Sequence, residues 1–435
     1  KPSGRSDRVT ARTANLKTMN VSTDAEPVTI IAIGAGNRTN KYLEYAARHP
    51  ERLKLAGVVE INEIRRRTTA ERFGLEPERC FTDYDSFFEN PLPADAVLIA
   101  TPENEHFEPC MKAIEAGYDV LLEKPIAQTL SECCRIEEAA RRKGVIVGVC
   151  HVLRYHPYFI RIKEIVDSGE LGEIISISHL VAVGLDRTTH GFVRGMWRRE
   201  EITNPMLISK CCHDIDFLLW LTEARCRKLS SFGSLRWFRA ENAPAQSAAR
   251  CIDCPVEKQC PYSAVDLYYN RRDWISNFDI PAGATLDEVI LRELRSGDYG
   301  RCVFRCDNDV VDHQIVSMEM DNDVTISFSM DAFTLGDQRE THIRLTHGEI
   351  DGDERTLRVR KFRGGEERVY DFSGLLEKPF HAGADLLLIE DFVDTLSRRE
   401  HRFRTAIANS VESHRICFEA ERSRLTGQTV TLEER

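Results

Sequence analysis

An apolar run that ends in a glycine turn constrains the fold of this chain more than any other feature. Residues 28–33 have the length of a buried strand, Gly34-Ala-Gly36 follows, and apolar residues then recur at helical spacing. A strand, a glycine turn and a helix in this order are the context in which dinucleotides bind. Gly34 allows the tight turn, and Gly36 lets the backbone approach a pyrophosphate at the helix N-terminus. Thr39 stands where a third glycine is usual, so this stretch alone is equally compatible with an ordinary βα turn.

The second strand adds a carboxylate at its end. Residues 53–59 are apolar and lead into Glu60, 26 residues after Gly34. An acid in this position accepts hydrogen bonds from the adenosine ribose diol. It also repels a 2′-phosphate, so the sequence favours NAD over NADP as cofactor. Arginines at positions 65–67 follow closely and weaken this preference.

Strands and helices alternate up to residue 150. Further apolar strands at 94–100, 119–123 and 145–150 are separated by helical patterns, which predicts a doubly wound parallel sheet of six strands. Right-handed crossovers place the loops after these strands at one edge. The strand at 119–123 ends in Glu123-Lys124-Pro125, at the position where open α/β sheets bind ligands. The alternative for this charged pair is a strand-end salt bridge.

Taken together, several short motifs resemble one enzyme family. They are Gly34-x-Gly36-x-Arg38, Glu60, Thr101-Pro102-x-x-x-His106, Glu123-Lys124-Pro125 and His151-x-x-Arg154-Tyr155. From about residue 27 to its end, the chain resembles the Gfo/Idh/MocA family, the relatives of glucose–fructose oxidoreductase and inositol dehydrogenase. The resemblance implies an NAD(P)-dependent oxidoreductase with an α/β Rossmann domain and an α+β C-terminal domain, whose open, mostly antiparallel sheet carries the substrate site. Carried onto this sequence, it implies cofactor contacts from Gly34, Gly36, Asn37, Arg38, Glu60, Thr101, Asn104, His106, Glu123, Lys124 and Arg154.

The resemblance divides the chain into three parts. Residues 1–26 are polar, and we expect a disordered extension or an expression tag there. Residues 27–150 are the predicted NAD(P)-binding domain. Residues 151–435 are the predicted substrate-binding and oligomerisation domain, with an insertion around 240–300. Family members often assemble through the open sheet face, so the resemblance implies a homodimer or homotetramer.

The catalytic candidates lie on two separate elements. In the family, a helix carries an aspartate four residues before a histidine, which puts both on one face. His213 matches the histidine, but Ser209 stands where the aspartate is expected, and Lys210 could substitute for it. We therefore predict that Lys124 polarises the substrate oxygen, that His213 is the general acid/base and that Lys210 assists it. A structural helix histidine is the alternative for His213.

Substrate contacts are expected from four polar residues outside that helix. Tyr155 and His190 would orient the substrate hydroxyls, and Arg194 lies in the same polar segment, 184–197, as His190. A charged surface loop explains that segment equally well. His313 opens a predicted strand pair, and residues at the mouth of a half-buried sheet can reach a ligand lying on it.

Three closely spaced cysteines suggest a metal site. Cys251, Cys254 and Cys260 form a C-x2-C-x5-C pattern, which is compatible with a structural zinc ion if Cys302 or Cys306 supplies a fourth ligand. The alternatives are a disulfide beside a free thiol, or three buried thiols. Most of the 14 cysteines lie in apolar or helical patterns, as is usual in reducing compartments, so we expect a cytoplasmic protein.

Charge and hydropathy exclude several classes of function. A net charge of −11 argues against a general binder of nucleic acid or acidic membranes, and no apolar run is long enough to span a membrane. The predicted function is hydride transfer between a nicotinamide and a carbinol carbon of a carbohydrate or cyclitol. One alternative is an NAD-dependent glycoside hydrolase, which oxidises its sugar transiently, eliminates the aglycone and reduces the ring again with a retained cofactor. Another is a non-catalytic regulator that senses nucleotide or sugar.

Overall fold

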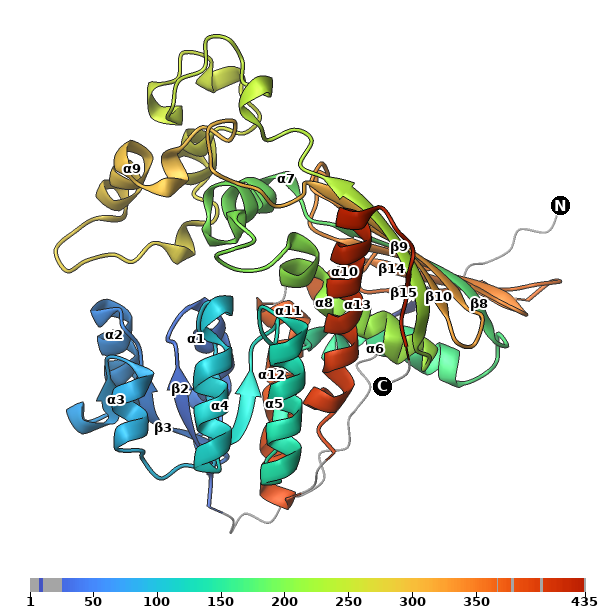
Figure 1. Ribbon diagram of the computed structural model, residues 1–435, viewed down its shortest axis with the longest axis horizontal. Helices are drawn as coiled ribbons and strands as arrows, with labels where there is room; N and C mark the ends of the chain where they lie inside the picture. Colours follow the sequence, from blue (N-terminus) through green and yellow to red (C-terminus); the bar gives the residue numbers. More distant parts are fainter. Residues whose placement is uncertain (1–7, 11–25, 366, 377–378, 400–401, 434–435) are drawn as a thin grey trace.

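The computed structural model describes residues 8–10, 26–365, 367–376, 379–399 and 402–433. In this part of the chain, a parallel sheet and a larger mixed sheet lie side by side, and a segment of short helices lies beyond the edge of both (Figure 1). No helix among the described residues is both long enough and apolar enough to cross a membrane.

A six-stranded parallel sheet forms the first domain and confirms the predicted doubly wound fold. Its order is β4-β3-β2-β5-β6-β7, with β2 (Val28–Ile33), β3 (Leu53–Val59), β4 (Cys80–Phe81), β5 (Ala96–Ile99), β6 (Asp119–Leu122) and β7 (Val147–Val149). The helices between the strands are α1 (Asn37–Arg48), α2 (Glu63–Phe73), η1 (Pro77–Arg79), α3 (Tyr84–Glu89), η2 (Glu103–Glu105), α4 (Phe107–Ala116) and α5 (Leu130–Lys143). The apolar pattern identifies five of the strands, and β4 escapes it because it is only 2 residues long.

Apolar layers cover both faces of this sheet. Alternate strand residues such as Val97 and Ile99 pack towards α4 and α5, whereas Ile30 and Leu98 pack towards α1. Burial on both sides explains why the strands read as continuous apolar runs. Helix α12 (Ala384–Arg398) returns from the far end of the chain to pack beside α1, so the C-terminal part also contributes to the first domain.

The second sheet is mixed but mostly antiparallel, as predicted. Its order is β1-β15-β14-β13-β12-β8-β11-β10-β9-β16, with β1 (Arg8–Thr10), β8 (Ile174–Ala182), β9 (Cys226–Ser234), β10 (His313–Met320), β11 (Thr325–Asp331), β12 (Arg339–Leu345), β13 (Gly348–Gly352), β14 (Thr356–Lys361), β15 (Arg368–Asp371) and β16 (Val430–Thr431). Residues 8–10 fall in the segment expected to be disordered. They instead form an edge strand parallel to β15, which corrects that expectation for these three residues.

Among the described residues, helices pack on one face of the second sheet. These are α6 (Pro157–Asp167), α8 (Met206–Thr222) and α13 (Ile407–Thr426), and further short helices are η3 (Val152–Tyr155), α10 (Ser373–Leu376) and α11 (Pro379–Ala382). Along β10, Val316 and Met318 are buried beneath the helices, whereas Ile315 and Ser317 point to the open face. The predicted homo-oligomer contact through this open face stays a prediction.

The chain leaves the second sheet between β9 and β10. This insertion, residues 235–312, contains one regular helix, α9 (Leu286–Ser296), which begins with a capping box formed by Thr285 and Glu288. Its other helical elements are η6 (Ala240–Asn242), η7 (Cys251–Asp253), η8 (Glu257–Gln259), η9 (Val265–Asn270), η10 (Ile275–Asn277) and η11 (Asp298–Gly300). The insertion packs against a second irregular segment made of α7 (Leu185–Arg187), η4 (Thr188–Arg194) and η5 (Met196–Arg198).

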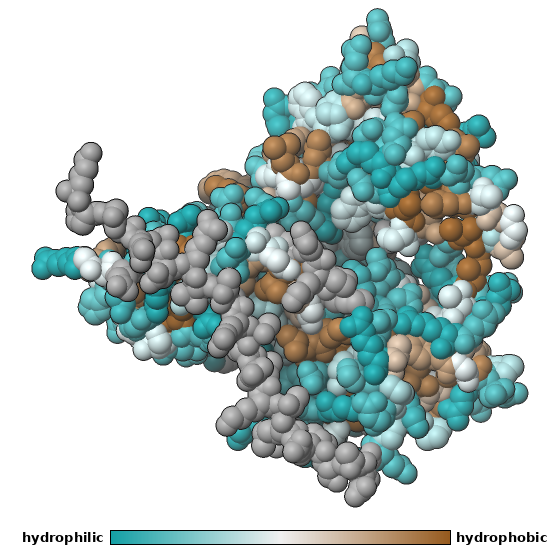
Figure 2. Space-filling model, turned by 180° about the vertical axis from the view of Figure 1, so that it is seen from behind, coloured by the Kyte–Doolittle hydropathy of each residue, from teal (hydrophilic) through white to brown (hydrophobic). Residues whose placement is uncertain are grey.

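The insertion contacts the nucleotide edge of the first domain. The Asp279 carboxylate accepts hydrogen bonds from Asn62 (3.1 Å) and from Arg65 Nε (2.9 Å), close to the start of α2. Seen from behind, the surface is hollowed between the insertion and the first domain, and apolar residues gather along the insertion's side of this hollow (Figure 2). The insertion therefore lies next to the edge at which the parallel strands end.

Candidate active site

The glycine turn after β2 leaves no room for a side chain at Gly34. Gly34 has a φ of +89°, and a Cβ there would lie 2.7 Å from the carbonyl oxygen of Ala100 on the neighbouring strand. Thr39, which replaces the third glycine, is buried, and its hydroxyl donates to the Gly34 carbonyl at 2.8 Å. The threonine thus stabilises the turn. Helix α1 begins after Gly36, which forms no side-chain cap hydrogen bond, and the N-terminus of a helix is a favourable place for an anion.

Glu60 lies at the end of β3 and faces this turn. Its carboxylate accepts hydrogen bonds from the backbone N–H of Ala35 at 2.6 Å and of Asn62 at 2.8 Å. The arginines that weakened the preference for NAD are engaged elsewhere. Arg66 donates to the Glu60 carbonyl at 2.6 Å, and Arg65 pairs with Asp279 of the insertion.

Arg38 and Glu123 form a buried ion pair behind the turn. Arg38 Nε lies 2.5 Å from Glu123 Oε1, and its Nη2 lies 2.8 Å from Asp385 of α12. Burial alone would lower the pKa of Arg38, but Tyr42, Glu123 and Asp385 hold that pKa well above its usual value. These contacts tie α1, β6 and α12 together, so Arg38 positions the turn through its protein partners.

His106 joins two of the strand-end loops. Its Nδ1 lies 2.7 Å from the carbonyl oxygen of Pro125 and its Nε2 lies 3.1 Å from that of Thr101. The ring is buried, whereas the predicted cofactor residues Asn37 and Asn104 are exposed. The structure thus gives His106 a positioning role between the ends of β5 and β6.

Lys124 meets helix α8 directly after β6. Its ammonium donates to the backbone carbonyl of Ser209 in the first turn of that helix. The Ser209 hydroxyl in turn donates to Glu103 at 2.7 Å. Asn204 and Trp197 also donate to Glu103, at 2.9 and 2.7 Å.

Glu103 is a buried carboxylate that the sequence did not reveal. Ser209 stands where the resemblance leads one to expect an aspartate, and Glu103 delivers a carboxylate to that place from the first domain. The one available signal was its position four residues after the end of β5 and two after Thr101.

His213 lies one turn after Ser209 on α8. Its Nε2 is 3.0 Å from Arg339 Nη2 and 3.1 Å from Asp214 Oδ2, and its Nδ1 has no hydrogen-bond partner among the described residues. Burial lowers the pKa of His213 well below its usual value, and Arg339 and Lys124 lower it further against the opposing effect of Asp214. The imidazole is therefore neutral near pH 7.

Lys210 lies on the same helix, three residues before His213. Its ammonium is 3.7 Å from Asp337, and its side chain is 15% exposed. Burial, together with the charge of Arg187, lowers the pKa of Lys210 to about 8 against the opposing effect of Asp337. An amine with this pKa can gain or lose a proton near neutral pH.

Arg154 and Tyr155 both form contacts between elements of the chain. Arg154 forms a two-fold ion pair with Asp216 of α8, at 2.7 and 2.8 Å, and both side chains are buried. Tyr155 is 2% exposed and donates its hydroxyl to Asp391 of α12 at 2.6 Å. Both side chains thus link neighbouring elements, and their predicted contacts with cofactor and substrate stay predictions.

The polar segment 184–197 packs against the insertion, and its role as a substrate loop stays a prediction. It folds into short helices in which His190 is 2% exposed, stacked on Tyr299 and Trp274 of the insertion. Arg194 is fully buried and donates to the Arg301 carbonyl at 2.8 Å. These residues attach the insertion to the second domain.

His313 lies on the face of the second sheet opposite to α8, and its substrate contact stays a prediction. It begins β10 and shares the open face of the sheet with Ile315 and Ser317, whereas α8 packs on the opposite face. Its Nδ1 is 2.9 Å from Asp312 Oδ1. Of the predicted site residues, the structure therefore brings together Lys124, Lys210 and His213.

Comparison with known proteins agrees with this architecture. Residues 28–151 match the family model described as "Oxidoreductase family, NAD-binding Rossmann fold", and residues 159–253 match the "GFO/IDH/MocA C-terminal domain". The chain is 22% identical over 313 residues to oxidoreductase YteT of Bacillus subtilis (strain 168), a match that covers 68% of this chain and 71% of the relative. It is 25% identical over 191 residues to inositol 2-dehydrogenase of Salmonella agona (strain SL483), covering 43% of this chain and 53% of that enzyme.

Solved structures share the fold at low sequence identity. An oxidoreductase from Agrobacterium radiobacter in complex with NAD+, L-tartaric acid and magnesium superposes with a TM-score of 0.69 at 16% identity, covering 93% of this chain and 98% of that one. An inositol dehydrogenase homolog from Azotobacter vinelandii complexed with NAD+ gives a TM-score of 0.67 at 18% identity, with 94% and 98% covered.

Proposed function

The chain belongs to the Gfo/Idh/MocA family of NAD-binding oxidoreductases, and from this premise we propose that it transfers a hydride between NAD and a carbinol carbon of a sugar or cyclitol. The nicotinamide supplies the redox chemistry when it is bound. The residues of this chain then have two tasks, which are to hold the substrate carbon in place and to move the hydroxyl proton.

The edge after β2 and β3 suits NAD. The turn at Gly34 admits no Cβ, and the uncapped N-terminus of α1 provides N–H groups for a pyrophosphate. The Glu60 carboxylate supports a ribose diol and opposes a 2′-phosphate. Because Arg65 and Arg66 are engaged by Asp279 and by the Glu60 carbonyl, they offer little to a 2′-phosphate, and we propose NAD as the cofactor.

The contact between Lys124 and helix α8 is the observation that best supports this proposal. The ammonium at the end of β6 contacts the first turn of the helix that also bears Lys210 and His213. A cation at this position stabilises the negative charge that develops on the substrate oxygen. We assign this role to Lys124.

The pKa values favour Lys210 over His213 as the proton acceptor. A general base works best when its pKa lies close to the working pH, and Lys210 has a pKa of about 8. The pKa of His213 is well below 6.5, so this ring binds protons weakly. We therefore propose that Lys210 exchanges the hydroxyl proton and that His213, held by Arg339, positions the substrate oxygen.

We infer the class of substrate from the proteins to which this chain is similar. Inositol 2-dehydrogenases are among the proteins to which the chain is similar, and the Azotobacter vinelandii homolog has been solved with NADH and myo-inositol. Both are proteins that act on, or bind, a polyhydroxylated ring, so we propose a sugar or cyclitol here.

Absorbance at the reduced-nicotinamide band tests the proposal. The protein, purified without added nucleotide, is incubated with NAD and a panel of sugars and cyclitols. We expect reduced nicotinamide to accumulate with one of them, and Lys124→Ala to lower kcat/KM by about 10³-fold, because a preorganised cation at the reacting oxygen is lost. Thermal unfolding of this variant should match that of the unmodified protein.

Two results would overturn the proposal. If no nucleotide binds, the cofactor roles of Gly34 and Glu60 are wrong, and so is the proposed NAD-dependent hydride transfer. If NAD co-purifies, stays oxidised in solution and a glycoside is nevertheless cleaved, the redox-assisted hydrolase explains the protein better.

A further inference from the structure

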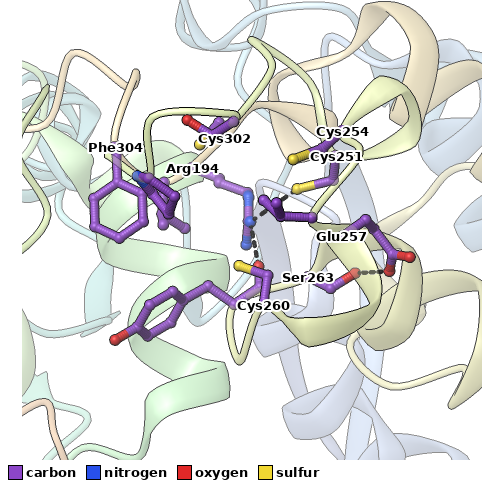
Figure 3. Close-up of a pocket in the computed structure, with 13 residues that line it drawn as sticks. Arg194, Cys251, Cys254, Glu257, Cys260, Ser263, Cys302 and Phe304 are labelled. Carbon is purple, nitrogen blue, oxygen red and sulfur yellow. Dashed lines mark hydrogen bonds between the residues drawn. The ribbon is translucent and has the colours of Figure 1, made fainter. Parts of the chain in front are cut away.

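Four cysteines of the insertion line one small cavity. Cys251, Cys254, Cys260 and Cys302 surround a space of about 20 Å³ in which Arg194 also lies (Figure 3). Cys306, the other candidate for a fourth ligand, does not line it. A space of this size holds about one water-sized occupant.

Backbone pairing brings Cys251 and Cys302, the first and last of the four cysteines, close together. An isolated antiparallel bridge pairs Arg250 with Arg301, and the N–H of Cys302 donates to the carbonyl of Ala249 at 2.9 Å. Cys251 and Cys302 are therefore neighbours although 51 positions separate them. The turn η7 then places Cys254 after Cys251, and Figure 3 shows both sulfur atoms on the same side of the cavity.

Arg194 is a buried cation that lacks an anion. Its side chain is 0% exposed. Its hydrogen bonds go to the backbone carbonyls of Arg301 and Tyr262, at 2.8 and 2.6 Å, and its Nη2 lies 3.6 Å from Cys251 Sγ. Its Nη1 has no partner, and no carboxylate pairs with it among the described residues. A charge buried in this way is costly unless a counter-charge is nearby.

We propose that the cavity binds one Zn²⁺ ion through the thiolates of Cys251, Cys254, Cys260 and Cys302, with Arg194 as the counter-charge. Each thiol gives up its proton to solvent, so four protons leave and four Zn–S bonds form. The resulting tetrathiolate site carries a net charge of −2, which Arg194 partly neutralises. Among the described residues, no group of three or more His, Cys, Asp or Glu side chains is arranged to hold a metal ion, so the proposal requires the four thiols to move closer together when the ion binds.

A zinc ion explains the buried charge of Arg194 better than a disulfide or a set of protonated thiols does. A disulfide or a set of protonated thiols is neutral and would leave Arg194 without a counter-charge.

The ion would join two small apolar clusters. Cys251 belongs to a cluster with Leu267 and Ile290, and Cys302 to another with Val303 and Phe304. Clusters of this size stabilise a fold weakly, and small domains often rely on a structural metal instead. The proposed site thus holds the insertion together and is independent of the reaction proposed for the active site.

Metal analysis of the full chain tests this proposal. The protein is expressed with zinc in the medium, purified in chelator-free buffer and analysed by mass spectrometry of its elements. We expect one zinc per chain, and X-ray absorption at the zinc edge should show four sulfur neighbours at about 2.3 Å. Cobalt(II) added to the zinc-depleted protein should give the intense bands of a tetrahedral thiolate site.

Single substitutions identify the ligands. We expect Cys254→Ser and Cys302→Ser to lose at least nine-tenths of the zinc, while Cys306→Ser, a matched control outside the cavity, retains it. If a ligand variant does not fold, stoichiometric release of zinc from the unmodified protein by a mercurial thiol reagent supplies the same evidence. A zinc content below one-tenth per chain, bound iron in place of zinc, or a disulfide within the set by mass spectrometry would each overturn the proposal.

Discussion

The parallel sheet of the first domain and the insertion between β9 and β10 differ in how much apolar surface each buries. The sheet is covered on both faces by large clusters contributed by α1, α4, α5 and α12. The insertion has two small clusters and mainly single-turn helices. A periodic apolar pattern is enough to hold the first region, whereas the second calls for a further source of stability such as the proposed zinc ion.

Two buried arginines show the same difference at the level of single charges. Arg154, which joins the first domain to α8, has the Asp216 carboxylate as a two-fold partner. Arg194, in the segment attached to the insertion, has only carbonyls and a thiol around it. The first charge is balanced within the folded chain, and the second needs an anion that the described side chains do not supply.

The strongest test of this comparison is Arg154→Met. The substitution leaves Asp216 buried without its partner, and breaking a buried ion pair in this way costs about 3–5 kcal/mol. We expect the free energy of unfolding in urea to fall by that amount. Adding Asp216→Leu should recover most of the loss, because no buried charge then remains.

Arg194→Met is the matched substitution in the insertion. It leaves no carboxylate unpaired, so we expect a smaller loss of stability and a faster release of zinc. Equal losses for the two arginines, with unchanged zinc retention, would remove the distinction between the regions.

Substitutions of Lys210 and Cys254 should distinguish residues that act in catalysis from residues that stabilise the insertion. We expect Lys210→Met to lower kcat/KM for alcohol oxidation by about 10²-fold, the usual contribution of a general base. Zinc content and thermal unfolding should stay unchanged, whereas Cys254→Ser should affect both. A variant that keeps full activity would exclude Lys210 as the proton acceptor.

The pH profile sharpens this assignment. Oxidation requires the neutral amine, and the pKa of Lys210 is about 8, so the rate should fall as the pH decreases below 8 and level off above it. In Lys210→Met this dependence should disappear. His213, whose pKa lies well below 6.5, would instead give a limb at acidic pH.

The sequence predicted the site best where the fold fixed its geometry. Gly34, Glu60 and Lys124 each follow a parallel strand, and such strand ends lie at one edge in any doubly wound sheet. Glu103 was missed because its partners, Trp197, Asn204 and Ser209, come from a distant part of the chain without a local pattern.

Three of the predicted substrate residues take positions that the sequence did not indicate, for related physical reasons. The alternation along a strand predicts that His313 and Gln314 face opposite sides of the sheet. It does not predict which of the two sides is covered by α8. Arg194 and Tyr155 lie on short helical turns, which have no periodicity that separates buried from exposed positions. A fully buried arginine is rare, so the charge of Arg194 suggested either an exposed position or a position in a binding site.

Glu60→Gln tests the nucleotide edge of the first domain. The amide keeps the shape but loses the charge that attracts the ribose hydroxyls and opposes a 2′-phosphate. We expect the Kd for NAD to rise about tenfold and the preference for NAD over NADP to narrow, as measured by fluorescence titration of the reduced cofactors. The exposed Glu78→Gln is the control, and a preference that does not change would assign the discrimination to another group.

The weakest link between the two regions is the contact of Asp279 with Arg65. Both side chains are about one-third exposed, and an ion pair of this kind contributes about 0.5 kcal/mol. We therefore expect Asp279→Asn to raise the NAD dissociation rate about twofold in stopped-flow experiments, and the difference to vanish at high salt. Asp273→Asn, which removes a pair with Arg271 inside the insertion, should leave the rate unchanged. A change of tenfold or more, insensitive to salt, would mean that the insertion holds the cofactor through apolar packing as well, and the two regions would then act as one binding unit.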